Sequence, residues 1–178
     1  DPRNRLIELA KNPFYLMLLA EAFWANQHDL SNRGRLLDGF AWRLFHREQD
    51  KKHPHWIEIE AQRRALSELA FAMLEQRSDT TLPYDQAAAM LPPAIRAKGE
   101  NHPIDPDILF RLGRQATLLD PALDDDVKFY HHLLQEYFAA LELLRRFAAG
   151  EDLSSRWQAP ARGRWWSRGP REKRRPAR

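Results

Sequence analysis

Apolar residues between positions 130 and 148 recur every three or four residues, which is the spacing of one face of an α-helix. A short β-like run at residues 127–130 precedes them. This apolar face consists of Tyr130, Leu133, Leu134, Tyr137, Leu141, Leu144 and Ala148. A second row on another face starts with His131 in the first turn and continues through Gln135, Phe138, Glu142 and Arg145. The pattern predicts a strand that leads directly into an amphipathic helix, with the apolar face in the core.

Helical patterns also precede this segment. After a short first helix capped by Asp1 and Pro2, helices are predicted at residues 13–25, 33–49, 58–76, 84–91 and 105–115. Asn12 can cap the helix that begins at Pro13. That helix is apolar nearly all round, so we expect it to be buried on most sides.

The segment between these helices and the last one predicts a β-hairpin, with strands at residues 116–119 and 127–130 joined by an acidic turn. Three helices, a hairpin and a following helix form the pattern of a winged-helix domain, in which the hairpin is the wing. A polar, proline-containing break at residues 50–56 is the predicted domain boundary. The expected fold is mainly α: a helical domain at residues 1–50, followed by a winged-helix domain at 57–149 with one small β-hairpin.

The charge distribution separates the last residues from the rest. The 178 residues carry a formal net charge of +3, but residues 151–178 hold nine Arg or Lys against three Asp or Glu. The first 150 residues are therefore slightly acidic. We expect the Trp-, Arg- and Pro-rich tail at 150–178 to be disordered, or to be a docking segment that requires a partner.

Composition excludes several classes of chemistry. The chain has no cysteine, which excludes disulfides, thiol nucleophiles and cysteine-ligated metals. The longest apolar run, at residues 14–25, is too short to cross a bilayer, and no signal sequence opens the chain. We expect a cytoplasmic protein without a membrane partner.

Histidine and acidic residues suggest further sites, each with a plainer alternative. A histidine at a helix start lies near the positive end of the helix dipole and free N–H groups, where an anion would bind. The alternative for His131 is local capping or packing. His53 and His55 lack the spacing of zinc ligands and are interpreted as solvated loop residues. Residues 124–126 are all Asp but lack the pattern of a calcium loop, so a solvated turn is expected.

Two motifs resemble a known family. The segment FYHHLLQEYFAA at residues 129–140 resembles the winged-helix signature of NACHT-type NTPases, signalling ATPases of the STAND class. That signature is Phe, any residue, His, three residues, then Gln-Glu-Tyr-Phe-Ala-Ala. The segment LAKNPFYL at residues 9–16 resembles the start of the family's helical domain, where an Asn-Pro motif follows the nucleotide-binding core. Together the two motifs bracket residues 1–149.

The resemblance implies a nucleotide switch. In the family, the winged-helix histidine contacts the β-phosphate of ADP in the closed state, and the proline of the helical domain packs against adenine. These roles carry over to His131 and Pro13. Exchange of ADP for ATP would release the closed state and permit oligomerisation. The expected cofactor is therefore ADP or ATP, with Mg²⁺ in the full-length parent, and the expected partners are the nucleotide-binding core and other protomers.

The catalytic half of such a switch is not encoded here. No GxxxxGK[ST] phosphate-binding loop occurs in the sequence, nor does an acidic magnesium-binding strand. We expect this chain not to hydrolyse ATP alone, because it lacks groups that hold magnesium and position water. The chain would be a regulatory fragment of a signalling ATPase.

Two alternatives stay open. One is a stand-alone winged-helix module that binds nucleic acid or protein and carries a basic tail. The helix expected to enter a DNA groove, residues 105–115, carries Asp105 and Asp107 against Arg111 and Arg114, so it is neutral, and the wing is acidic. Nucleic-acid readers present a basic face there, which leaves only nonspecific contact through the tail. The other alternative is a gene remnant that preserves only the fold.

Overall fold

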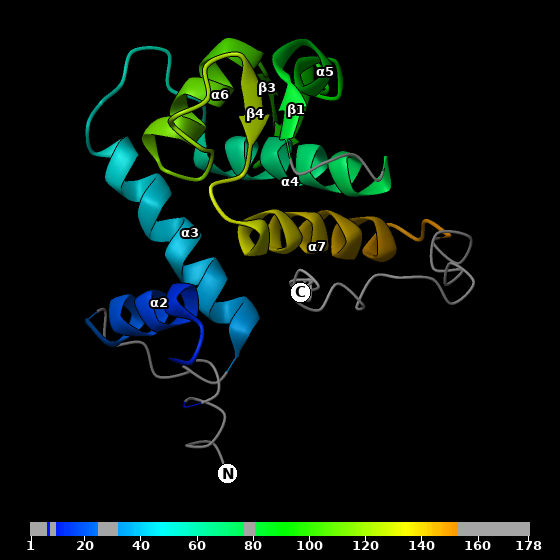
Figure 1. Ribbon diagram of the computed structural model, residues 1–178. Coiled ribbons are helices and arrows are strands. Elements are labelled where there is room, and N and C mark those ends of the chain that lie inside the picture. Colours follow the sequence, from blue (N-terminus) through cyan, green and yellow to red (C-terminus); the bar gives the residue numbers. More distant parts are fainter. Residues whose placement is uncertain (1–6, 8–9, 25–31, 77–80, 153–178) are drawn as a thin grey trace, which may run out of the picture. The chain divides into compact units, whose positions relative to one another are not determined.

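The computed structural model describes residues 7, 10–24, 32–76 and 81–152, and is mainly helical over these ranges. The predicted first helix start and the basic tail beyond residue 152 lie outside the described residues. In chain order the elements are α2 (Pro13–Trp24), α3 (Arg33–Gln49), α4 (Ile59–Glu75), β1 (Thr81–Pro83), α5 (Tyr84–Ala89), β2 (Ala94–Ala97), β3 (Glu100–Pro103), α6 (Pro106–Gln115), β4 (Asp126–Lys128) and α7 (His132–Ala148). The mainly α class is confirmed. Figure 1 shows β1 and β4 beside α5.

Side-chain caps fix where four of the helices begin. The Asn12 carboxamide accepts the Phe14 N–H at 2.9 Å, which starts α2 at Pro13 as predicted. Asn32, Glu58 and Asp105 cap α3, α4 and α6 in the same way. Each cap satisfies N–H groups that have no partner within the helix. These starts agree with the sequence because capping chemistry is local.

The predicted wing is only partly formed. The expected strand at residues 116–119 is wrong: Ala116 ends α6, Thr117 has a φ of 57°, and only Leu119 forms a bridge, to Phe129. β4 instead pairs antiparallel with β1, a strand that the sequence did not predict. Figure 1 shows β1 and β4 side by side. Three-residue strands carry too few positions for period-two alternation, so their pairing partner could not be predicted.

A second hairpin corrects the expectation of a single one. β2 and β3 pair antiparallel within residues 92–103, where the sequence predicted neither a helix nor a strand. The two residues between them, Lys98 and Gly99, have φ values of 51° and 87°. Positive φ at both central positions is the requirement of a tight type I′ turn. Gly99, at the second turn position, is the residue from which the sequence could have predicted this turn.

The apolar core is one cluster that extends from Phe14 to Ala139. Its largest fully buried side chains include Phe45, Phe110, Phe129 and Phe138. By contacts, the described residues up to Arg145 belong to one compact unit. The predicted boundary at residues 50–56 stays a prediction.

The buried face of α7 differs from the predicted one. Tyr130 and Leu144, at the ends of the predicted apolar face, are 53% and 63% exposed, whereas Phe138 and Glu142 of the second row are buried. Glu142 reaches the interior because Arg145 binds both its carboxylate oxygens, at 2.6 and 2.8 Å. A charge on a buried face is tolerated only when it is paired, and periodicity alone does not reveal the pairing.

The predicted burial of α2 on most sides is also wrong. One face is buried and consists of Phe14, Tyr15, Leu18 and Ala22. On the other side Leu16, Phe23 and Trp24 are exposed, Trp24 by 85%. Composition predicted an all-round apolar helix, but the described residues cover only one side of it.

Candidate functional site

His131 occupies the cap position of α7, directly before its first helical residue. Its backbone oxygen accepts the N–H groups of Leu134 and Gln135 at 2.9 and 3.3 Å. Its ring nitrogen Nδ1 faces the N–H of Leu133 at 3.2 Å. His131 itself therefore occupies one of the N–H groups at the helix start where an anion was expected to bind, and the capping alternative holds for Nδ1.

The surroundings of His131 favour the neutral imidazole. Its ring stacks on Phe14, with centroids 4.0 Å apart and planes 6° apart, and the ring of His132 lies 4.3 Å away. Burial lowers the pKa of His131 below its ordinary value, and the neighbouring His132 lowers it further. An Nδ1 that accepts a hydrogen bond must also be unprotonated.

The proton of the neutral ring is thus assigned to Nε2. Within the described part of the chain, Nε2 of His131 has no hydrogen-bond partner. An Nε2–H without a partner can donate to an oxyanion without disturbing the cap. His131 can therefore hold α7 and contact a ligand at the same time, each with a different nitrogen.

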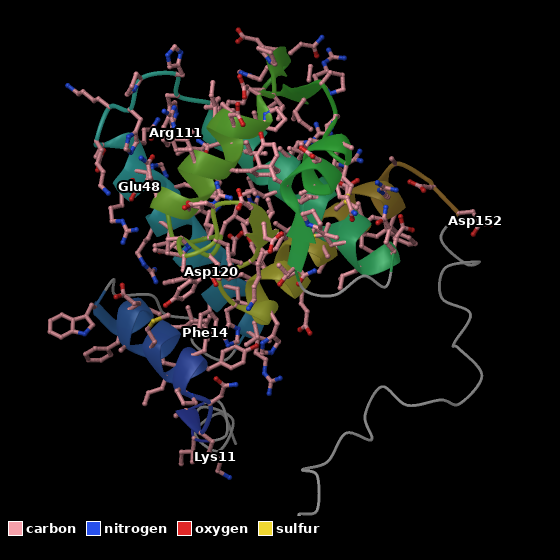
Figure 2. All side chains as sticks on the ribbon, turned by 45° about the horizontal axis from the view of Figure 1, so that its top comes forward. Lys11, Phe14, Glu48, Arg111, Asp120 and Asp152 are labelled. Carbon is pink, nitrogen blue, oxygen red and sulfur yellow. The ribbon has the colours of Figure 1, made fainter. Side chains whose placement is uncertain are left out.

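Pro13 is the first residue of α2 and is exposed. The next residue, Phe14, makes the ring contact with His131 and meets Phe40 of α3 edge-on, with centroids 6.1 Å apart. The structure thereby brings the start of α2 close to the start of α7 (Figure 2, Phe14). Phe14 was not singled out from the sequence, although it directly follows the Asn-Pro pair.

The other histidines have different surroundings. His53 is not a solvated loop residue: its Nε2 lies 3.1 Å from the Glu48 carboxylate, and its ring stacks on Trp56. Glu48 is buried at the end of α3 and also binds Arg47 and Lys51. Burial of Glu48 opposes ionisation, but these three partners outweigh it and lower its pKa. The group is an internal charge network. His55 is exposed, as expected.

Metal binding finds no support in the described ranges. No group of three or more His, Asp or Glu residues among them could hold a metal ion. In the acidic turn, Arg114 donates to the backbone oxygens of Asp124 and Asp126, at 3.2 Å each. The Asp124 and Asp125 residues themselves are exposed, which agrees with a solvated turn.

The surface of α6 bears on the DNA-binding alternative. Arg114 is occupied by the turn, while the Tyr84 hydroxyl donates to Asp107 at the start of the helix. Burial raises the pKa of Tyr84, and the neighbouring carboxylates, Asp107 above all, raise it further, to about 12. Arg111 is the exposed cation of the helix (Figure 2). The described part of α6 presents no basic face of the kind that binds phosphate backbones.

Comparison of the chain with protein-family models, curated proteins and solved structures finds no match. The family resemblance therefore rests on the two motifs themselves. In the ranges that the structure describes, no helix has the length and apolar character needed to cross a membrane.

Proposed function

We propose that this chain is the helical and winged-helix part of a NACHT-type signalling NTPase, and that His131 contacts the β-phosphate of bound ADP. The observation that carries this proposal is that the two ring nitrogens of His131 have different roles. Nδ1 caps α7, and Nε2 is left to donate. Phe14 stacks on the ring and holds it beside the helix that follows the Asn-Pro pair.

The order of elements supports the winged-helix part of the proposal. If the β2–β3 hairpin is left out, the chain after α3 runs as a helix (α4), a strand (β1), two helices (α5 and α6) and a strand pair. The strand pair consists of β4 and the bridge between Leu119 and Phe129. In a winged-helix domain the first strand pairs with the wing, as β1 does with β4. The β2–β3 hairpin would then be an insertion between the second and third helices of the domain.

The mechanism is a switch controlled by differential binding. A contact from His131 to ADP stabilises the closed arrangement, and a nucleotide that lacks this contact releases it. A ligand shifts such an equilibrium only as far as its affinities for the two states differ. The phosphate-binding loop and magnesium ligands would belong to a core that precedes these residues in the parent protein. Exchange of ADP for ATP would then expose surfaces for assembly with other protomers.

The test is ADP release from a protein that joins these residues to their core. A phosphate-binding loop encoded in frame upstream of Asp1 is the first requirement. His131→Ala should then accelerate ADP release by roughly tenfold or more, because a hydrogen bond to a charged group contributes about 1.5–3 kcal/mol. His132→Ala is the matched control, since His132 is adjacent and exposed.

Release should be measured by fluorescence of a labelled ADP at pH 8, where His131 is neutral because its pKa lies below 6.5. Unchanged release in His131→Ala, or equal acceleration in both variants, would remove the assigned role of His131. Absence of an upstream phosphate-binding loop would remove the nucleotide proposal altogether.

A further inference from the structure

Gln135 follows His131 by one helical turn on the same face of α7, since residues four apart in a helix are neighbours. It is only 5% exposed. Among the buried polar residues that the structure describes, only Gln135 has a side chain without a hydrogen bond. The other buried polar residues, which all have partners, are Glu48, Gln62, Ser67 and Glu142. A buried carboxamide without a partner is costly and rare in folded proteins.

The carboxamide of Gln135 is nevertheless accessible to a ligand. In the described ranges, the side-chain nitrogens and oxygens that lack both a partner and accessible surface belong to Arg43, Arg63 and Arg64. The two polar atoms of Gln135 are not among them, so each keeps some accessible surface. A ligand atom can therefore reach this carboxamide and replace the water that would otherwise satisfy it.

Two helix starts meet beside Gln135. Phe14, in the first turn of α2, stacks on the ring of His131 at the cap of α7. Each helix has the positive end of its dipole at its start, and such ends attract anions. Because Cα–Cβ bonds tilt toward the N-terminus of a helix, the Gln135 side chain leans toward this junction. The two dipoles and the carboxamide of Gln135 therefore converge near His131.

Charges of both signs lie around this junction. Arg33 of α3 lies over the ring of Tyr15, 5.5 Å from its centroid. Burial raises the pKa of the Tyr15 hydroxyl, Arg33 lowers it and Glu136 of α7 raises it. Arg33 and Glu136 are both exposed and offset each other. An anion at the junction would therefore depend on neutral donors and on the helix dipoles.

We propose, resting on the nucleotide switch proposed above, that Gln135 is a second contact to the diphosphate of the bound nucleotide. Its carboxamide nitrogen donates to one phosphate oxygen, and Nε2 of His131 donates to another. Two donors one helical turn apart suit a group with several acceptor oxygens. The contact gives the unpaired carboxamide of Gln135 its partner.

The full chain, isotopically labelled, is titrated with pyrophosphate at pH 8 while NMR follows the His131 ring and the Gln135 carboxamide. Both sets of resonances should shift with one dissociation constant. Gln135→Met keeps the length of the side chain and removes both polar atoms. It should weaken the binding that the His131 ring reports by roughly tenfold. Sulfate, which has a single anionic centre, is the comparison probe and should bind more weakly.

The outcomes distinguish the contact of Gln135 from that of His131. If Gln135→Met binds pyrophosphate as tightly as the unmodified chain, the proposal for Gln135 is overturned and the contact of His131 stands. If neither residue responds, or if sulfate binds as tightly as pyrophosphate, the junction has no diphosphate site and the proposal is overturned as well. ADP release from the joined protein then decides the role of His131 separately.

Thermal unfolding separates a ligand contact from a structural role. Without ligand, Gln135→Met should unfold at the same temperature as the unmodified chain or higher, because the carboxamide that it removes has no partner. A clearly lower unfolding temperature would assign Gln135 a structural role and overturn the proposal.

Gln62→Met is the matched control for this measurement. Gln62 is a buried glutamine of α4, and its carboxamide donates to the backbone oxygen of Ile57 at 2.6 Å. Gln62→Met should therefore unfold at a lower temperature and leave pyrophosphate binding unchanged. Weaker binding in both variants would show that the loss does not come from a contact of Gln135, and would overturn the proposal.

Discussion

At the scale of residues, the proposed nucleotide contact depends on the imidazole ring of His131. Its two nitrogens are distinguished by one hydrogen bond, from the Leu133 N–H to Nδ1. The sequence predicted that this histidine lies at a helix start, because helical periodicity begins there. It could not predict which nitrogen faces the helix, since that depends on the rotamer that Phe14 imposes by stacking.

The first prediction concerns the pKa of His131. Burial and then His132 hold it below the ordinary value of 6.5. The unfolded state therefore binds the proton more readily, and this histidine contributes stability that is present above pH 6.5 and lost as pH falls through the folded-state pKa. NMR titration of the ring should give a pKa below 6.5, and His132→Ala should raise it. A pKa at or above 6.5 in the folded chain would contradict this.

The second prediction concerns Phe14, which is nearly buried and contacts both His131 and Phe40. Phe14→Ala should lower the free energy of unfolding by about 3 kcal/mol, as is typical for a buried phenylalanine. It should also raise the pKa of His131, because the ring loses its cover. Denaturant unfolding and NMR titration measure the two effects.

Phe23→Ala is the control for Phe14→Ala, because Phe23 is an exposed phenylalanine of the same helix. It should change stability by less than about 0.5 kcal/mol and leave the His131 titration unchanged. A Phe14 variant that shifts neither quantity would show that the stacking does not persist in solution.

At the scale of elements, the sequence predicted helices better than strands for a physical reason. Helix starts are fixed by local caps such as Asn12 and Asp105, and helix bodies repeat their apolar positions many times. β1 and β4 have three residues each and pair across much of the chain. Nothing within three residues specifies a distant partner, so the pairing follows from the packing around it.

The third prediction concerns Gly113, where α6 packs against Leu119 of the Leu119–Phe129 bridge. A Cβ at this position would lie 2.8 Å from Cδ1 of Leu119, which is buried and has little room to move. Overpacking costs about 1–3 kcal/mol, whereas alanine gains about 1 kcal/mol of helix propensity over glycine. The clash outweighs the gain in helix propensity, so Gly113→Ala should lower the free energy of unfolding by about 1 kcal/mol. Urea unfolding measures this change.

The comparison that isolates this contact is the same substitution in a Leu119→Ala background. Without the leucine side chain the clash disappears, and Gly113→Ala should become stabilising by up to about 1 kcal/mol. A substitution that has the same sign in both backgrounds would mean that α6 does not approach Leu119 so closely.

At the scale of the whole molecule, a polar network joins three helices that are distant in sequence. Arg63 of α4 donates to Asp38 of α3 at 2.6 Å and to the Tyr137 hydroxyl of α7 at 3.2 Å. The Tyr137 hydroxyl donates to Asp38 as well. Arg63 also lies over the ring of Trp42, 5.5 Å from its centroid. Sequence periodicity placed Tyr137 in the core correctly, but partners so far apart along the chain leave no local signal.

This network predicts energetic coupling between α3 and α7. Burial raises the pKa of the Tyr137 hydroxyl, and the hydrogen bond to Asp38 raises it further, so the hydroxyl remains a donor throughout the physiological range. In a double-mutant cycle of Asp38→Asn and Tyr137→Phe, the two substitutions should be non-additive by about 1 kcal/mol, since a neutral partner weakens the shared bond. Unfolding in urea measures all four variants.

A cycle of Asp38→Asn with Tyr84→Phe provides the reference. The Tyr84 hydroxyl binds Asp107 and belongs to another group of contacts, so these substitutions should add within about 0.5 kcal/mol. Equal coupling in both cycles would mean that the effect is not specific to the shared hydrogen bond. Specific coupling would show that α7, the helix that carries the FYHHLLQEYFAA motif, is held to α3 through the Asp38 carboxylate.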